Sequence, residues 1–258
     1  MPRRPRSSTV RLAVVDIDGC LTPGVASDWN WRTLQSILVL NQRARRGEQV
    51  PSVTLCTGRQ QPYVEVLMQA IGAHQPGIYE NGCGLYFPDT YSFAEHPLIT
   101  VEARKTLAVA KARLQRDIVG RGLGYFQPGR DASLSVFPLA PIHVEELLQI
   151  VVAALRADAE SLTILNSAAC IDITPKGVSK GAGLCWLAEM VGVPLGRIGG
   201  IGDSTSDLSF LDLVGESAAP ANAMADVKAV VDYVSPYENG DGVLDILARW
   251  ASRIWGEN

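Results

Sequence analysis

Short apolar runs rich in β-branched residues alternate along the chain with segments in which apolar residues recur every three or four positions. The short runs predict buried strands, and the helical spacing predicts amphipathic helices. The expected strands are Val10–Val15, Val53–Cys56, Gly77–Tyr79, Arg197–Ile201, Glu216–Ala219 and Tyr233–Val234. The expected helices are Thr33–Arg46, Pro62–Ile71, Gly181–Val191, Ala223–Val231 and Val243–Trp255. Because the two kinds of element alternate, we expect an α/β fold whose parallel strands are joined by crossover helices.

The stretch 84–172 has a different order of predicted elements, in which strands and helices do not alternate regularly. Its expected strands are Leu85–Phe87, Ser133–Phe137, Thr163–Leu165 and Cys170–Ile173, and its expected helices are Val101–Val119 and His143–Ala157. This pattern indicates a smaller α+β domain inserted into the larger one. We therefore expect a discontinuous core domain at 10–83 and 173–258, an inserted domain at 84–172, and a disordered basic arm at 1–9.

Composition and charge narrow the function classes. Hydrophobic residues make up 47% and charged residues 19% of the chain, as in ordinary soluble globular proteins. The net charge of −4 includes three arginines of the arm, so the rest of the chain is more acidic than this value suggests. Because an acidic surface repels nucleic acid, we expect no nucleic-acid partner. No long apolar segment follows the arm, so no membrane partner is expected. The five cysteines are odd in number and unpaired in spacing, which favours free thiols and a cytoplasmic location.

Candidate chemistry lies where four of these predicted elements begin or end. Asp16 and Asp18 follow the first apolar run and, being two residues apart, point to the same side of an extended chain. Thr57-Gly58-Arg59 follows the second run, Lys180 lies at a helix start, and Gly202–Asp207 follows the run RIGGI. Because parallel strands place ligands at their carboxyl edge, these residues are expected to gather there.

Each motif alone has a simpler explanation. The aspartates and the Gly202–Asp207 loop could cap helices, Thr57-Gly58 could form an ordinary turn, and Lys180 could be a solvated charge. Their combination in this order is much more specific. It favours a site for a metal ion and a phosphoryl group.

The order of the motifs DIDGCLT, TLCTGR, Lys180 and GDSTSD resembles the haloacid dehalogenase superfamily of phosphohydrolases. Further similarity, in NGCG at 81–84, KGVSKG at 176–181 and Asn222-Ala223, is to its Cof-type branch, which includes phosphoglycolate, sucrose-phosphate and other sugar-phosphate phosphatases. The resemblance implies a Rossmann-like parallel-sheet core domain and a smaller inserted α+β cap domain. A cap of this kind closes over the cleft and selects the leaving group of the substrate.

The resemblance also implies the roles of the motif residues. Asp16 is expected to attack phosphorus and form an aspartyl-phosphate, and Asp18 to act as general acid and base. Thr57, Gly58 and Lys180 are expected to bind the phosphoryl oxygens, with Thr57 and Lys180 counted among the catalytic residues. A Mg²⁺ cofactor is expected at a site whose residues are Asp16, Asp18 through its carbonyl, Asp203 and Asp207, the last also being a candidate partner of Lys180.

Two departures from the usual family pattern concern Cys20, where threonine is commoner, and Ser206, where asparagine is usual. Cysteine replaces a hydroxyl hydrogen bond by a weaker one. Neither departure removes an essential charge, so we expect catalysis to survive.

The substrate is expected to be a small phosphorylated metabolite. Candidate contacts are Arg59 and Asn81 from the core, and Arg121 and Arg130 from a strongly basic part of the cap, where an arginine could bind a second anionic group. Thr-Gly-Arg is similar to sugar-phosphate phosphatases, whereas Glu80-Asn81-Gly82 resembles archaeal-type phosphoglycolate phosphatases. Both substrates therefore stay open, as do two other functions, a phosphomutase and a non-catalytic phosphometabolite-binding protein. The oligomeric state is not predicted.

Overall fold

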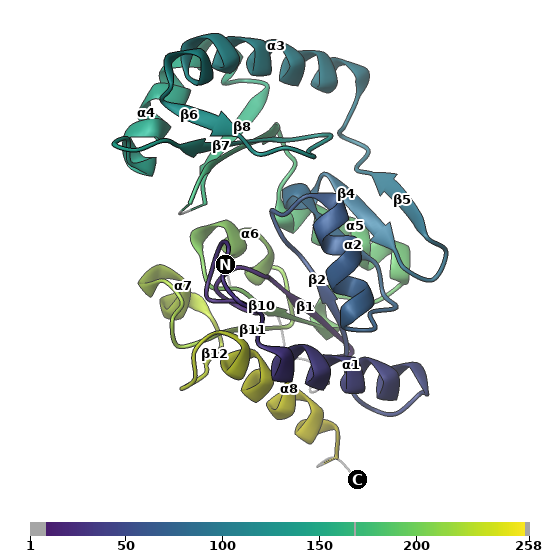
Figure 1. The fold of residues 1–258 in the computed structure, drawn as a ribbon. Coiled ribbons are helices and arrows are strands. Elements are labelled where there is room, and N and C mark those ends of the chain that lie inside the picture. The colour runs from purple at the N-terminus through teal and green to yellow at the C-terminus, as the bar shows by residue number, and fades with distance from the viewer. Residues whose placement is uncertain (1–8, 168, 256–258) are drawn as a thin grey trace.

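The computed structural model describes residues 9–167 and 169–255, with side chains through residue 252. The predicted basic arm therefore lies, through residue 8, outside the described residues. A five-stranded parallel sheet runs through the lower lobe of the molecule (Figure 1), with the strand order β12-β11-β10-β1-β2. Its strands are β1 (Leu12–Val15), β2 (Ser52–Leu55), β10 (Ile198–Ile201), β11 (Glu216–Ala219) and β12 (Tyr233–Val234). The predicted α/β fold with a parallel-sheet core is confirmed.

Helices cover both faces of this sheet because consecutive strand residues point to opposite sides. Ala13 and Val15 of β1 pack in one apolar cluster with α1, α2 and α8. Leu12 and Val14 pack in a second cluster with α5, α6 and α7. These helices are α1 (Trp31–Arg45), α2 (Gln61–Ala70), α5 (Lys180–Val191), α6 (Leu208–Leu211), α7 (Ala225–Val230) and α8 (Asn239–Trp255). The expected helix Ala223–Val231 is shorter than predicted, since α7 begins only at Ala225.

A small antiparallel sheet lies beside the core. It consists of β3 (Gly77–Tyr79), β4 (Gly84–Phe87) and β5 (Ser92–Glu95), and β3 and β4 lie against α2 and α5. Strand β5 escaped prediction because its side chains are mostly exposed and leave no apolar alternation to detect. Short 3-10 turns connect many elements of the chain, namely η1 (Glu80–Gly82), η2 (Val119–Arg121), η3 (Arg156–Asp158), η4 (Leu195–Arg197) and η5 (Thr205–Asp207).

A second lobe is built on a four-stranded antiparallel sheet with the order β6-β7-β9-β8. Its elements are α3 (Val101–Asp117), β6 (Gly124–Phe126), β7 (Leu134–Pro138), α4 (Val144–Ala154), β8 (Leu162–Asn166) and β9 (Ile171–Pro175). Both helices lie on the side of this sheet that faces away from the core (Figure 1). Its other side faces the core, and we call this lobe the cap. The predicted domain borders stay predictions, with β9 running across the expected border at 172–173.

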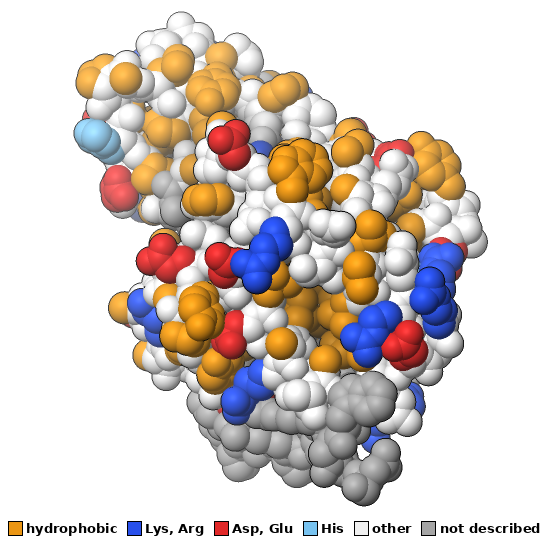
Figure 2. All heavy atoms as spheres, turned by 60° about the horizontal axis from the view of Figure 1, so that its bottom comes forward, with side chains coloured by type: hydrophobic (Ala, Val, Ile, Leu, Met, Phe, Trp, Pro, Cys, Tyr) orange, Lys and Arg blue, Asp and Glu red, His pale blue; other side chains and the backbone are white. Residues whose placement is uncertain are grey.

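The space-filling view shows the two lobes as a larger and a smaller body, with acidic and basic side chains interspersed on the face drawn (Figure 2). Within the described residues, every helix is too short or too polar to cross a membrane.

Candidate active site

The predicted motif residues meet at the carboxyl edge of the parallel sheet. Asp16 directly follows β1, Thr57 lies just beyond β2, and Asp203 lies just beyond β10. Because β2, β1 and β10 are neighbours in the sheet, their ends lie side by side. Lys180 joins them as the first residue of α5, a helix capped by the Ser179 side chain. These residues line a cavity of about 210 Å³ between the core and the cap.

Lys180 lies between two buried carboxylates. Its Nζ donates to Asp207 Oδ1 at 2.6 Å and lies 3.0 Å from Asp16 Oδ1. The second contact is an ion pair without hydrogen-bond geometry, so among the described residues Asp16 Oδ1 is a buried oxygen without a hydrogen-bond donor. Burial opposes the charged ammonium, but the two carboxylates outweigh it and raise the pKa of Lys180. Burial also raises the pKa of Asp16, against the opposing attraction of Lys180. A cation is therefore held beside the predicted nucleophile.

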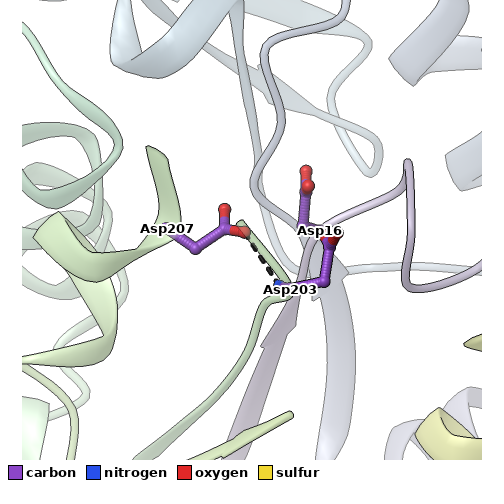
Figure 3. A group of neighbouring side chains, drawn as sticks. All are labelled: Asp16, Asp203 and Asp207. Carbon is purple, nitrogen blue, oxygen red and sulfur yellow. Dashed lines mark hydrogen bonds between the residues drawn. The ribbon is translucent and has the colours of Figure 1, made fainter. Parts of the chain in front are cut away.

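Asp207 is fully buried, and protein donors engage both of its carboxylate oxygens. Oδ1 accepts from Lys180, while Oδ2 accepts from the backbone N–H groups of Asp203 at 3.0 Å and Ser204 at 2.9 Å. Figure 3 shows the contact with the Asp203 amide. Because its oxygens are already occupied, this arrangement favours Asp207 as a partner of Lys180 over Asp207 as a direct metal ligand.

A group of three carboxylates gathers around the end of β1. Asp16, Asp203 and Asp207 each offer an oxygen within 4.8 Å of the others (Figure 3). Burial, reinforced by the Asp207 charge, raises the pKa of Asp203 to about 7. Gly19 makes the close approach feasible: its φ is +82°, and a Cβ there would lie 2.1 Å from Asp203 Oδ2. Cys20, noted as a departure from the family pattern, places its Sγ 3.8 Å from Asp203 Oδ1 as a weak donor.

Asp18 is held by Arg59. The guanidinium donates from Nε to Oδ2 and from Nη2 to Oδ1, both at 2.6 Å. It also lies 4.7 Å from the centre of the Tyr63 ring, which supports it from one side. The predicted acid–base residue and one predicted substrate residue thus contact each other within the cavity.

The predicted phosphate-binding loop is closely constrained. Thr57 N donates to Ile78 O at 3.1 Å, and Thr57 Oγ1 accepts from Arg59 N at 3.2 Å. A Cβ on Gly58 would lie only 3.0 Å from Asn81 Oδ1, so Asn81 packs directly on this glycine. Three of the predicted residues, Thr57, Gly58 and Asn81, therefore lie together on the core side of the cavity.

The two arginines predicted on the cap have different positions. Arg130 lines the cavity with a side chain only 5% exposed, 3.8 Å from Asp172 Oδ1. Arg121 ends the turn η2, is exposed and does not line the cavity. The reason lies in the fold, since η2 follows α3 and so continues the helical layer that faces away from the core. The structure brings only Arg130 to the candidate site.

Two buried acidic residues of this region received no role from the sequence. Glu80 lies within η1 and Asp172 lies on β9, and both are almost fully buried. Asp172 Oδ2 accepts from Asn81 Nδ2 at 3.0 Å, and its Oδ1 accepts from Ser135 Oγ. The triplet Glu80-Asn81-Gly82 stood out in the sequence only as a point of similarity to relatives. Its partners are about 50 to 90 residues away, and no local pattern pointed to them.

The chain that carries this cavity and its buried lysine is similar to known hydrolases. Residues 136–247 match the haloacid dehalogenase-like hydrolase family. A protein of Methanopyrus kandleri named phosphoglycolate phosphatase is 29% identical over 94% of this chain and 98% of its own.

Two solved structures share the fold. A haloacid dehalogenase-like hydrolase from Bacteroides thetaiotaomicron has a TM-score of 0.74 at 17% identity, covering 93% of this chain and 99% of its own. Synechocystis sucrose-phosphatase, solved with sucrose and phosphate, has a TM-score of 0.68 at 15% identity, covering 94% of this chain and 98% of its own. The resemblance to haloacid dehalogenase-like hydrolases that the motifs indicated is confirmed, in sequence over residues 136–247 and in fold over most of the chain. The predicted enzyme class, a phosphatase, is confirmed as well.

Proposed function

We propose that this protein is a Mg²⁺-dependent phosphomonoester hydrolase that acts through a phosphorylated Asp16 on a small phosphorylated carboxylate of the phosphoglycolate kind. The observation that carries the proposal is the position of Lys180, whose Nζ contacts both Asp16 and Asp207 at the edge of the sheet. A buried carboxylate beside a fixed ammonium is suited to attack an anionic phosphoryl group, because the cation offsets the repulsion between the two anions.

The donor set fits a hard divalent cation. Asp16 and Asp203 offer carboxylate oxygens within reach of each other, and the buried Asp16 Oδ1 receives no hydrogen bond from the part of the chain that the structure describes. Oxygen ligands of this kind are those that Mg²⁺ prefers. Asp16, Asp203 and the Asp18 carbonyl would hold the ion, which supplies positive charge that offsets repulsion between nucleophile and phosphate.

The proposed reaction proceeds in two displacements. A carboxylate oxygen of Asp16 forms a bond to phosphorus as the bond to the leaving oxygen breaks, and Asp18 gives that oxygen a proton. Water then attacks phosphorus, Asp18 takes its proton, and the bond from Asp16 to phosphorus breaks. Thr57 Oγ1, the Gly58 amide and Lys180 Nζ bind the phosphoryl oxygens throughout.

Two observations support a small, doubly anionic substrate. The cavity of about 210 Å³ is smaller than the roughly 300–1,000 Å³ usual for drug-sized ligands. Arg130 on the cap side offers a guanidinium that could pair with a carboxylate. The Methanopyrus relative, named for phosphoglycolate, agrees with this choice. A sugar phosphate is the second candidate, since sucrose-phosphatase shares the fold.

The proposal is tested by measuring phosphate release from phosphoglycolate, hexose phosphates and nucleotides, with Mg²⁺ and with a chelator. We expect metal-dependent release, highest for phosphoglycolate, and a loss of at least about 10⁴-fold in Asp16→Asn. Asp212→Asn, at an exposed aspartate outside the cavity, is the matched control. Isomerised sugar phosphate without free phosphate would instead identify a mutase, and binding without turnover would identify a binding protein.

A further inference from the structure

The segment Glu80-Asn81 contacts both lobes of the molecule. Glu80 is fully buried and Asn81 is 3% exposed, yet their φ angles are +49° and +55°. Residues other than glycine rarely adopt positive φ angles of this kind, and such a conformation persists only where surrounding contacts hold it. Asn81 N donates to Thr57 O at 3.0 Å and Glu80 N donates to Arg59 O at 2.9 Å. The backbone of the segment is thus bonded to the phosphate-binding loop.

The Glu80 side chain reaches the cap from this position. Its Oε1 accepts from Asp131 N at 3.0 Å, and its Oε2 accepts from Ala132 N at 3.2 Å and from Ser133 Oγ at 2.6 Å. These three donors directly precede β7 of the cap sheet. Burying a carboxylate without such donors would destabilise the folded state. The hydrogen bonds from the cap loop therefore stabilise Glu80 in its buried position.

The contact continues from Ser133 to Arg130. A serine hydroxyl has a single hydrogen, and Ser133 Oγ gives it to Glu80. The lone pairs of the same oxygen are then free to accept, and Arg130 Nη1 donates to them at 3.1 Å. Gln127 Oε1 fixes the other side of the guanidinium, accepting from Nε at 3.0 Å and Nη2 at 2.7 Å. Glu80 therefore orients the Ser133 hydroxyl and, through it, the Nη1 side of the Arg130 guanidinium.

We propose that Glu80 is a positioning residue that holds Arg130 of the cap at a fixed place relative to the Thr57–Arg59 loop, so that both ends of one substrate are bound at once. This inference rests on the proposed function, because it assumes that the phosphoryl group lies at the loop and a second anionic group at Arg130. Glu80 itself touches neither end. Its effect falls on substrate recognition and not on the chemical step.

The test compares Glu80→Gln on two substrates, phosphoglycolate and p-nitrophenyl phosphate, which has no second anionic group. The amide cannot accept all three hydrogen bonds, so we expect KM for phosphoglycolate to rise about tenfold or more, the usual effect of losing one charge-assisted bond. We expect kcat for phosphoglycolate, and both constants for p-nitrophenyl phosphate, to change less than about threefold. The matched control is Glu189→Gln, at an exposed glutamate of α5 outside the cavity.

A double-mutant cycle distinguishes positioning from a general effect on folding. If Glu80 acts through Arg130, Glu80→Gln adds almost nothing to KM in an Arg130→Met background. Additive effects, or equal losses of kcat on both substrates, would overturn the inference. Should Glu80→Gln not fold, Ser133→Ala carries the same test, since it removes only the hydroxyl that joins Glu80 to Arg130. Failure of the wild-type protein to release phosphate would count against the proposed function, whereas normal wild-type activity with an unchanged variant would count against Glu80 alone.

Discussion

Arg59 holds both carboxylate oxygens of Asp18 in a two-pronged ion pair, with nitrogen–oxygen distances of 2.6 Å on each prong. A planar guanidinium fixes the plane of a carboxylate in a way that a lysine ammonium does not. Because the guanidinium contacts one lone pair on each oxygen, only the remaining lone pairs of Asp18 are open to exchange a proton while this ion pair is formed. The orientation of the predicted acid–base residue therefore depends on Arg59.

Arg59→Lys keeps the charge and removes the fork, so it is expected to impair proton transfer more than binding. We expect turnover of phosphoglycolate to fall about 10- to 100-fold. The first-turnover release of p-nitrophenolate from p-nitrophenyl phosphate should fall less than about threefold, since this leaving group needs little protonation and Asp18 acts as base only in the later displacement. Asp18→Asn should give the same pattern with a larger loss on phosphoglycolate, about 100- to 10,000-fold. Rapid-mixing measurements of the first turnover, together with steady-state phosphate release, check this. A first-turnover loss on p-nitrophenyl phosphate as large as the loss on phosphoglycolate would contradict the general-acid role of Asp18.

Asp207→Asn removes the charged partner of Lys180 inside the protein. Breaking one member of a buried ion pair usually destabilises a protein by about 3 to 5 kcal/mol, because the other charge stays buried and unpaired. We expect a loss of this size in the free energy of unfolding by urea, and activity reduced together with it. The control Asp212→Asn, at an exposed aspartate, should leave the urea midpoint unchanged. An unaltered midpoint in Asp207→Asn would show that Lys180 does not depend on this contact.

The raised pKa of Asp203, about 7 against an ordinary value of 3.8, gives the metal-free protein a distinct pH dependence. Between about pH 4 and 7 the folded state keeps a proton that the unfolded state has released, so this contribution to stability declines as pH rises through the window. Mg²⁺ binds the ionised carboxylate, so its stabilising effect grows over the same range. We expect the melting temperature to rise more on adding Mg²⁺ at pH 8 than at pH 5.

Asp203→Asn removes the titrating group and is the control for this effect. Its melting temperature should vary less with pH over the same window and should respond little to Mg²⁺. A wild-type response to Mg²⁺ that is equal at pH 5 and pH 8 would contradict the role given to Asp203.

Arg130 and Arg121 form a matched pair for testing the cap. Both lie in the same basic stretch, but only Arg130 lines the cavity. We expect Arg130→Met to raise KM for phosphoglycolate about tenfold or more, as expected for a lost charge-assisted contact. Arg121→Met should leave KM within about twofold. A larger effect from Arg121 would place the substrate on the other side of the cap sheet.

Much of the fold could be read from the sequence, because its strands and helices follow strong local patterns. The run LAVV ends in Asp16 and becomes β1, and the helical spacing after Lys180 becomes α5. Strand β6 and strand β5 were missed, since Gly124–Phe126 and Ser92–Glu95 are short and carry little apolar alternation. Such strands form because neighbouring strands offer hydrogen bonds, which local sequence does not encode.

Local sequence patterns were enough to predict that Asp16, Thr57 and Asp203 lie together at the sheet edge, because each follows a strand whose direction fixes where it ends. They did not reveal which arginine of the cap reaches the cavity, nor that Glu80 joins the cap to the Thr57–Arg59 loop. The difference lies in the range of the interactions: strand ends follow from local patterns, whereas the buried carboxylate of Glu80 accepts from donors about 50 residues away.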